Sequence, residues 1–222
     1  LGAIDGHRRL TEIGKRLGRL PVEPRVGRMI LAAEDNHCLA EVLIIAAALE
    51  CQDVRVRPAE HQGEADAQHA KFVDPWSDFL SYLRLWDFYH ELREKHGSSR
   101  MQKILRSNYL SFHAFREWSD IQRQLRETLT ESGLKIPPRK LHLEPLNPNR
   151  MEPKVNERET DKRSHKEEPK KDKRPDRPAE YEAIHRSLLT GLLSGIAHRS
   201  EKGEYSGADQ VKMFLWPGSG LQ

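Results

Sequence analysis

The sequence predicts a mainly α-helical protein, and three features of its 222 residues carry that prediction. In residues 38–49 every position except Glu41 is apolar, and the many Ala and Leu residues favour helix over strand. Two later segments, 76–95 and 100–130, repeat apolar residues at helical spacing. Because only short connections separate the segments, we expect them to pack together as a helical bundle.

The first 35 residues alternate short helical signals with helix breakers. Thr11 is expected to cap a helix that runs to about Leu17, because its hydroxyl can accept a hydrogen bond from the first turn. The stretch Leu20-Pro21-Val22-Glu23-Pro24 is predicted to be extended, since a residue before proline is pushed out of helical geometry. Pro24 suits the first position of a second helix, which we expect to reach Ala33.

The middle of the chain predicts a buried helix, a polar connection and a long amphipathic helix. The apolar run 38–49 has no polar face, so other elements have to cover it on several sides. Residues 54–68 form the polar connection, which contains Pro58 and Gly63. The next helix is expected over residues 76 to about 95, with Trp76, Phe79, Leu80, Leu83 and Trp86 on one face and Tyr82, Leu85 and Tyr89 on another.

A third and longest helix is predicted from Arg100 to about Thr130. Its apolar residues form one broad stripe at the helical period, made of Met101, Ile104, Leu105, Phe112, Phe115, Trp118, Leu125 and Leu129. Asn108 and Ser111 fall inside this stripe, where a buried amide or hydroxyl needs a partner. We favour bonds from both side chains to neighbouring backbone. The alternative is a polar notch that faces a groove for nucleotides.

The composition changes abruptly over residues 150–178. This segment holds eleven Lys or Arg and eight Asp or Glu, with only Met151 and Val155 as aliphatic anchors. It cannot bury enough apolar surface to offset the entropy lost on ordering, which predicts a mixed-charge disordered linker. After it, a helix is expected from Ala179 with Ile184, Leu188, Leu189, Leu192 and Leu193, and then a turn and a strand over 211–216 that no partner strand follows.

The residue pattern argues against ATP hydrolysis, zinc binding and membrane insertion by this chain. ATP hydrolysis requires a glycine-rich loop ending in Lys-Ser or Lys-Thr, and the sequence contains neither that loop nor Asp-Glu-Ala-His. Cys38 and Cys51 form no zinc motif and no disulfide framework, which favours a reduced, cytoplasmic setting. No apolar run is long enough to span a membrane. We therefore expect no catalytic residue, metal or cofactor in this chain.

Two arginines of the predicted third helix are the best candidates for binding the phosphates of a single nucleic-acid strand. The net charge of +3 is only mildly basic, so the local arrangement of charges matters more. Arg116 and Arg123 are two turns apart, about 10 Å along the axis, and on nearly the same side. Such a row can follow the phosphates of a single strand. The alternative is a solvated charged flank that forms weak pairs with Glu117 and Glu127.

Several motifs, in one order along the chain, carry a family resemblance. Before the linker they are Leu1-Gly2-Ala3-Ile4-Asp5, Leu20-Pro21-Val22-Glu23-Pro24-Arg25, the apolar run 38–49, Ser77-Asp78-Phe79-Leu80, Asn108-Tyr109-Leu110-Ser111 and Arg116-Glu117-Trp118. After it comes Ile184-His185-Arg186-Ser187-Leu188-Leu189-Thr190-Gly191. Together they resemble DEAH/RHA-type ATP-dependent RNA helicases, and Arg116-Glu117-Trp118 with Asp120-Ile121 is similar to the bacterial HrpA-like branch.

The resemblance implies a domain order and a set of site residues. It implies a partial winged helix over 1–35, a helical ratchet domain over 36–140, the linker over 141–178 and a truncated OB-like start over 179–222. It further implies RecA-like motor domains before Leu1 that bind ATP and Mg. The implied RNA-side residues are Asn108, Ser111, Arg116 and Arg123, with Ser77 and Asp78 as a weaker pair. Many relatives have an arginine where this chain has His113, so the residues that contact RNA in this chain can differ from those of the family.

The function expected from these features is to hold single-stranded RNA during translocation driven by motor domains outside the chain. The chain begins without Met and ends soon after Pro217-Gly218-Ser219-Gly220, so we expect a piece of a longer protein. The alternative function is a helical scaffold that docks a protein partner, with Arg116 and Arg123 as a solvated face only.

Overall fold

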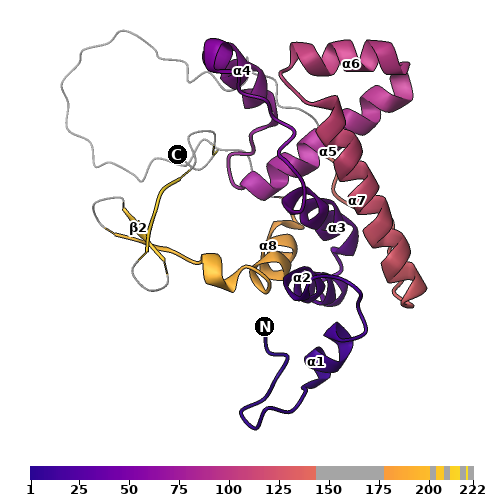
Figure 1. Cartoon of the computed structure of the whole chain (residues 1–222), viewed down its shortest axis with the longest axis vertical. Coiled ribbons are helices and arrows are strands. Elements are labelled where there is room, and N and C mark those ends of the chain that lie inside the picture. Colours follow the sequence, from indigo (N-terminus) through magenta and orange to yellow (C-terminus); the bar gives the residue numbers. More distant parts are fainter. Residues whose placement is uncertain (144–177, 201–203, 208–210, 216–218, 220–222) are drawn as a thin grey trace, which may run out of the picture.

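The computed structural model describes residues 1–143, 178–200, 204–207, 211–215 and 219, and this part of the chain is mainly helical (Figure 1). The predicted fold class is thereby confirmed. Its α-helices are α1 Glu12–Leu17, α2 Pro24–Asp35, α3 Leu39–Leu49, α4 Gln62–His69, α5 Asp78–Lys95, α6 Ser98–Ser107, α7 Phe112–Glu131 and α8 Tyr181–Leu189. None of the described helices is long and apolar enough to cross a membrane.

The capping signals near the start of the chain act as predicted. The Thr11 side chain accepts a hydrogen bond from the Gly14 N–H and begins α1. The Glu23 side chain accepts from the N–H groups of Arg25 and Val26, and Pro24 occupies the first turn of α2. Local sequence therefore sets both helix starts.

Helix α3 is the centre of the core, as its apolar sequence predicts. Every residue from Leu39 to Ala48 is buried, and α2, α5, α7 and α8 surround the helix (Figure 1). Glu41 is buried as well, and its Oε1 accepts hydrogen bonds from the Lys140 and Leu141 N–H groups. These bonds satisfy the carboxylate and fasten the segment that follows α7 onto α3.

The predicted single helix over 100–130 is wrong, because the chain breaks it into α6 and α7. Tyr109 lies between the two helices with φ +53°, in the left-handed region that a helix cannot contain. The Leu110 backbone forms an isolated antiparallel bridge with Arg55. After the break α7 descends along the side of the bundle (Figure 1). The apolar stripe survives across both helices, with Met101, Leu105, Phe115, Trp118 and Leu129 all buried.

The predicted polar connection over 54–68 contains regular structure that its sequence does not suggest. Two short 3-10 helices, Ala59–His61 and Ala70–Phe72, flank α4. Although most of α4 is exposed, Ala65 and His69 are buried. Burial of these two side chains anchors a helix whose own sequence has little apolar periodicity.

The C-terminal helix α8 packs on α2 and α3, although the chain between residues 143 and 178 separates them in sequence. The Asn36 amide donates to the Ser187 hydroxyl at 3.0 Å, and the Thr190 hydroxyl donates to the Arg28 carbonyl at 3.2 Å. The helix ends before Leu192 and Leu193, which were predicted to belong to it. Gly191 follows the helix at a close approach to α2, because a Cβ there would lie only 2.5 Å from the Arg25 carbonyl oxygen.

A small antiparallel sheet follows α8, with strand order β1 His198–Arg199, β2 Tyr205–Ser206 and β3 Lys212–Met213. The strand predicted over 211–216 is shorter than expected, and Trp216 lies outside the described residues. Its partner precedes it, because Tyr205 pairs with Met213 in a region predicted to be a turn. Almost all of the predicted linker, residues 144–177, also lies outside the described part of the chain.

Candidate nucleic-acid interface

The break between α6 and α7 explains why Asn108 and Ser111 interrupt an apolar stripe. Asn108 ends α6, and its amide donates to the Ile104 carbonyl at 2.8 Å. Ser111 caps α7, and its hydroxyl accepts from the Ala114 N–H at 3.2 Å. Both side chains therefore bond to neighbouring backbone, which was the favoured interpretation. Neither is fully buried, so both border a surface.

This turn is held from outside by the segment after α3. The Ser111 N–H donates to the Val54 carbonyl, and the Val56 N–H donates to the Tyr109 carbonyl, both at 2.8 Å. The Lys71 ammonium donates to the Asn108 amide oxygen at 2.8 Å. The turn is thus fixed on both sides of Tyr109, which is how the chain sustains a left-handed residue there.

Arg55 links this turn to the start of α5, and no sequence signal singled it out. Its guanidinium donates to both carboxylate oxygens of Asp53 and lies 5.8 Å from the centre of the Tyr82 ring. Burial acts to raise the pKa of Asp53, but the bonds and charge of Arg55 outweigh it and lower that pKa. The charge of Arg55 is therefore already matched by a carboxylate, which favours a positioning role over phosphate binding.

Ser77 and Asp78 begin α5, and the structure gives each a partner inside the protein. The Ser77 side chain is only 3% exposed and accepts from the N–H groups of Phe79 and Leu80. Its hydroxyl also bonds to His185 Nε2 of α8 at 2.6 Å. Asp78 Oδ2 accepts from the Ser219 hydroxyl at 2.7 Å. Ser77 is therefore covered by α8, whereas Asp78 is partly exposed.

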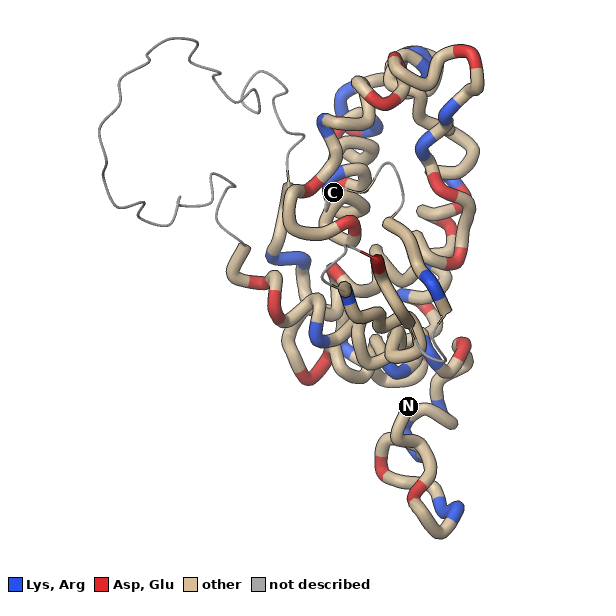
Figure 2. The backbone as a smooth tube through the Cα atoms, turned by 90° about the vertical axis from the view of Figure 1, so that its left-hand side faces the viewer, with Lys and Arg blue, Asp and Glu red and all other residues tan. Residues whose placement is uncertain are grey.

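Arg116 and Arg123 share the exposed side of α7, as their spacing predicts, but their surroundings differ. Arg123 pairs with Asp120 at 3.1 Å and with Glu127 at 3.4 Å, and its side chain is 62% exposed. Arg116 is exposed and makes no ion pair within the described part of the chain. Figure 2 shows basic and acidic residues interspersed along the helices. Arg116 is thus the more available cation of the two.

The described residues offer no metal site and no activated cysteine. They contain no group of three or more His, Cys, Asp or Glu side chains placed to hold a metal ion. Burial raises the pKa of the Cys38 thiol, and it raises the pKa of the Cys51 thiol to about 11. Both thiols are therefore protonated at neutral pH and poor nucleophiles.

Comparison with known proteins places the chain in a family. A family model of the helicase-associated domain (HA2), ratchet-like, matches residues 23–106. The chain is 36% identical over 214 residues to the ATP-dependent RNA helicase HrpA of Escherichia coli, an alignment that covers 96% of the chain. The chain belongs to the DEAH/RHA-type RNA helicases, in the HrpA-like branch.

Other relatives of this HrpA-like chain support the same assignment. It is 40% identical over 129 residues to the HrpA homolog of Haemophilus influenzae, which covers 58% of the chain. It is 30% identical over 145 residues to the pre-mRNA-splicing factor ATP-dependent RNA helicase DEAH10 of Arabidopsis thaliana, which covers 61% of the chain. The chain spans 14%, 10% and 20% of the lengths of these three relatives, respectively.

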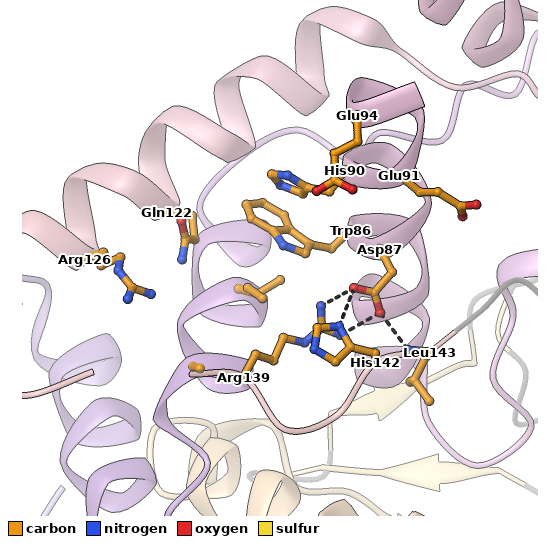
Figure 3. A pocket seen from close by; sticks show the side chains of 12 residues that line it. Trp86, Asp87, His90, Glu91, Glu94, Gln122, Arg126, Arg139, His142 and Leu143 are labelled. Carbon is orange, nitrogen blue, oxygen red and sulfur yellow. Dashed lines mark hydrogen bonds and ion pairs between the residues drawn. The ribbon is translucent and has the colours of Figure 1, made fainter. Parts of the chain in front are cut away.

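The HrpA-like chain also has a pocket of about 590 Å³ between α3, α5, α7 and the segment after α7. Figure 3 shows Trp86 and His90 projecting from α5 into this pocket, with Gln122 and Arg126 facing them from α7. The Asp87 carboxylate accepts two hydrogen bonds from Arg139. It also accepts one from the Leu143 N–H at 2.7 Å. Asp87 thus closes one end of the pocket by holding the segment after α7.

The environment of His90 predicts a pH-dependent stability for the HrpA-like chain. Burial, with a smaller contribution from nearby Arg93, lowers the pKa of His90 to about 4. In the unfolded chain a histidine titrates near 6.5, so as pH falls below that value the unfolded state binds a proton that the folded state does not. The contribution of His90 to stability is therefore complete above about pH 6.5 and is lost as pH falls toward 4.

We expect the free energy of unfolding to fall by about 1 to 2 kcal/mol from His90 alone between about pH 7.5 and about pH 5. Urea unfolding at both pH values, on the wild type and on His90→Gln, measures this contribution. Burial also lowers the pKa of His69, which acts in the same direction and is present in both proteins. Equal pH dependence in the two proteins would show that His90 titrates normally in the folded state.

Proposed function

We propose that this chain is an RNA-binding accessory region of an ATP-dependent DEAH-type RNA helicase, and that it holds single-stranded RNA during translocation. The observation that carries the proposal is the 36% identity to an ATP-dependent RNA helicase across 96% of the chain. ATP and Mg would bind to RecA-like motor domains of the same protein, outside this chain, in the cytoplasm. The chain itself would contribute contacts to RNA and no chemistry.

The proposed domain order is the one that the family resemblance implies. Residues 1–35 would end a winged-helix domain, and residues 36–140 would form the ratchet domain, whose family model matches 23–106. Residues 141–178 would be a linker, and 179–222 would start an OB-like domain. The three-stranded antiparallel sheet after α8 is compatible with such a start.

The exposed side of α7 is the proposed contact with RNA. Arg116 projects from it with no acidic partner in the described residues, so it can neutralise a phosphate without first giving up an ion pair. Arg123 would have to leave Asp120 and Glu127 to do the same. The fixed turn at Asn108 and Ser111 sets the direction in which α7 leaves the bundle. RNA contact is therefore expected to depend more on Arg116 than on Arg123.

Replacing Arg116 by Ala is expected to weaken binding of a single-stranded RNA roughly fivefold at about 0.1 M salt. The reason is that one phosphate contact is lost, so fewer counterions are released from the RNA on binding. Arg123→Ala should weaken binding less than twofold, since its charge is already shared with two carboxylates. Fluorescence anisotropy with a labelled oligouridine measures both affinities on the whole chain.

Arg126→Ala is the matched control, because Arg126 lies on the same helix but lines the pocket with Trp86. Its affinity for RNA should equal that of the wild type. If the wild type binds RNA and all three variants bind equally well, α7 is not the RNA-binding face. If the folded wild type does not bind RNA at all, the helical scaffold that docks a protein becomes the better description.

A further inference from the structure

A second pocket, of about 400 Å³, lies where the end of α5 and the start of α6 meet the first half of α7. Arg93 and His96 line it from the end of α5, Ser98 from the start of α6 and Arg116 from α7. Three separate elements therefore bring basic and hydroxyl side chains to one hollow. It is separate from the pocket at Trp86 and His90, which opens between α3, α5 and α7.

The charge in this pocket is unbalanced in favour of anions. Arg93 and Arg116 are both exposed, and neither makes an ion pair within the described residues. The one acid in the lining, Asp120, already accepts a hydrogen bond from Arg123 at 3.1 Å. Two cations thus face the hollow against one carboxylate that is engaged elsewhere, so an anion would be attracted there.

The start of α6 adds donors to the same pocket. No side chain caps this ten-residue helix, its first turn contains no acid, and its N-cap position is Gly97. The first N–H groups of a helix have no partner within the helix and carry partial positive charge. Ser98, the first residue of α6, lines the pocket, so these N–H groups lie beside the two arginines. This arrangement suits a phosphate oxygen.

Two hydroxyl groups in the lining lack partners of their own. Tyr89 is only 3% exposed, and its hydroxyl makes no hydrogen bond within the described part of the chain. Its ring is stacked on Phe115 with 4.6 Å between the centres, so packing fixes its position. The Ser119 hydroxyl is buried without a partner as well. A buried hydroxyl such as that of Ser119 is normally bonded, and a bound oxyanion would accept hydrogen bonds from both hydroxyls.

We propose that this pocket binds one phosphate group of the RNA backbone, held by Arg93, Arg116, the Tyr89 hydroxyl and the N–H groups that begin α6. The inference rests on the proposed RNA-binding function and deepens it by assigning a specific phosphate site. Arg93, which no sequence pattern indicated, becomes a binding residue equal in weight to Arg116. Arginine suits this role because its planar fork can bond two phosphate oxygens at once.

Arg93→Ala tests the site on the whole chain, with an oligouridine as the probe. Affinity at about 0.1 M salt is expected to fall roughly fivefold, and the slope of log affinity against log salt to decrease by roughly 0.7. Tyr89→Phe keeps the ring stacked on Phe115 and should cost two- to threefold with no change in slope. Lys103→Ala, which removes an exposed cation of α6 outside the lining, should change neither quantity.

The same variants separate failure of the pocket from failure of the proposed function. If the wild type binds oligouridine and Arg116→Ala weakens binding while Arg93→Ala does not, the pocket is not a phosphate site and the function stands. If the wild type does not bind, the proposed function itself fails. Thermal melting followed by circular dichroism should show that Arg93→Ala and Tyr89→Phe remain folded.

Inorganic phosphate distinguishes the backbone of RNA from a free anion as the occupant. Titration followed by amide chemical shifts should move Ser98 and Ser99 in the wild type and much less in Arg93→Ala. The inference predicts that the oligouridine moves the same amides and competes with phosphate. Shifts with phosphate alone, at unchanged RNA affinity in Arg93→Ala, would overturn the assignment to RNA.

Discussion

Replacing Asp74 by Ala is expected to lower the free energy of unfolding by about 3 to 5 kcal/mol, because it leaves a buried guanidinium without its carboxylate. Asp74 Oδ2 lies 2.9 Å from Arg84 Nη2, and the two side chains are only 3% and 9% exposed. Asp74 Oδ1 also accepts from the Trp76 N–H at 2.9 Å. The pair therefore holds the start of α5, which carries Ser77 and Asp78. Urea unfolding measures the loss.

Two further variants make this result specific to burial. Asp66→Ala breaks an ion pair with Arg57 whose side chains are 48% and 41% exposed, and it should cost much less stability than Asp74→Ala. The double variant Asp74→Leu with Arg84→Met removes both buried charges and should recover most of the stability. Equal losses in Asp74→Ala and Asp66→Ala would show that the Asp74 pair is not buried in solution.

Trp118→Ala is expected to cost about 3 to 5 kcal/mol as well, through the cavity that it leaves. Trp118 is fully buried, and its ring centre lies 5.0 Å from that of Trp86. Its indole N–H donates to the Ile44 carbonyl at 2.8 Å. Trp118 therefore ties α7, with Arg116 on its outer side, to the central helix α3. Chemical denaturation followed by circular dichroism measures the effect.

Two control variants separate the possible causes of this loss. Trp118→Phe distinguishes packing from the hydrogen bond, and Phe214→Ala shows what the loss of an exposed aromatic ring costs. Trp118→Phe keeps most of the ring volume but removes the indole hydrogen bond to the Ile44 carbonyl, which still accepts its bond within α3, so about 0.5 to 1.5 kcal/mol should be lost. Phe214 is 82% exposed, and Phe214→Ala should change stability by less than about 0.5 kcal/mol. If Trp118→Ala is as mild as Phe214→Ala, α7 is not packed on α3.

The elements that could be predicted from sequence are those whose signals are local. Thr11 and Pro24 mark helix starts by the chemistry of one side chain or ring, and both starts are where the sequence places them. Helix α3 was predictable because an apolar run of its length has to be buried. In these cases neighbouring residues are sufficient to determine the outcome.

The elements that were missed depend on contacts between distant residues. The apolar residues keep one helical period on both sides of Asn108 and Ser111, so that period gives no sign that the helix ends there. The break is stabilised by Val54 and Val56, more than fifty residues earlier. Helix α4 was not predicted for the same reason, because it is anchored by the burial of Ala65 and His69. Long-range backbone pairing leaves no periodic signal in sequence.

The candidate site was predictable in part. The spacing of Arg116 and Arg123 gave their shared side of α7, but the pairing of Arg123 with Asp120 and Glu127 is visible only in three dimensions. Arg93 was missed because α6 folds back and brings the end of α5 against α7. Ser77 matches a family motif, and the structure gives it a role in capping α5 beneath α8.

The most direct test of RNA binding by this chain is the affinity for oligouridine measured at about 50 mM and about 200 mM salt. Two to three phosphate contacts predict an affinity that falls roughly tenfold over this range. Arg116→Ala should flatten that dependence, and ATP should leave it unchanged. An affinity that does not respond to salt, or no binding by the folded chain, would contradict a role in holding RNA.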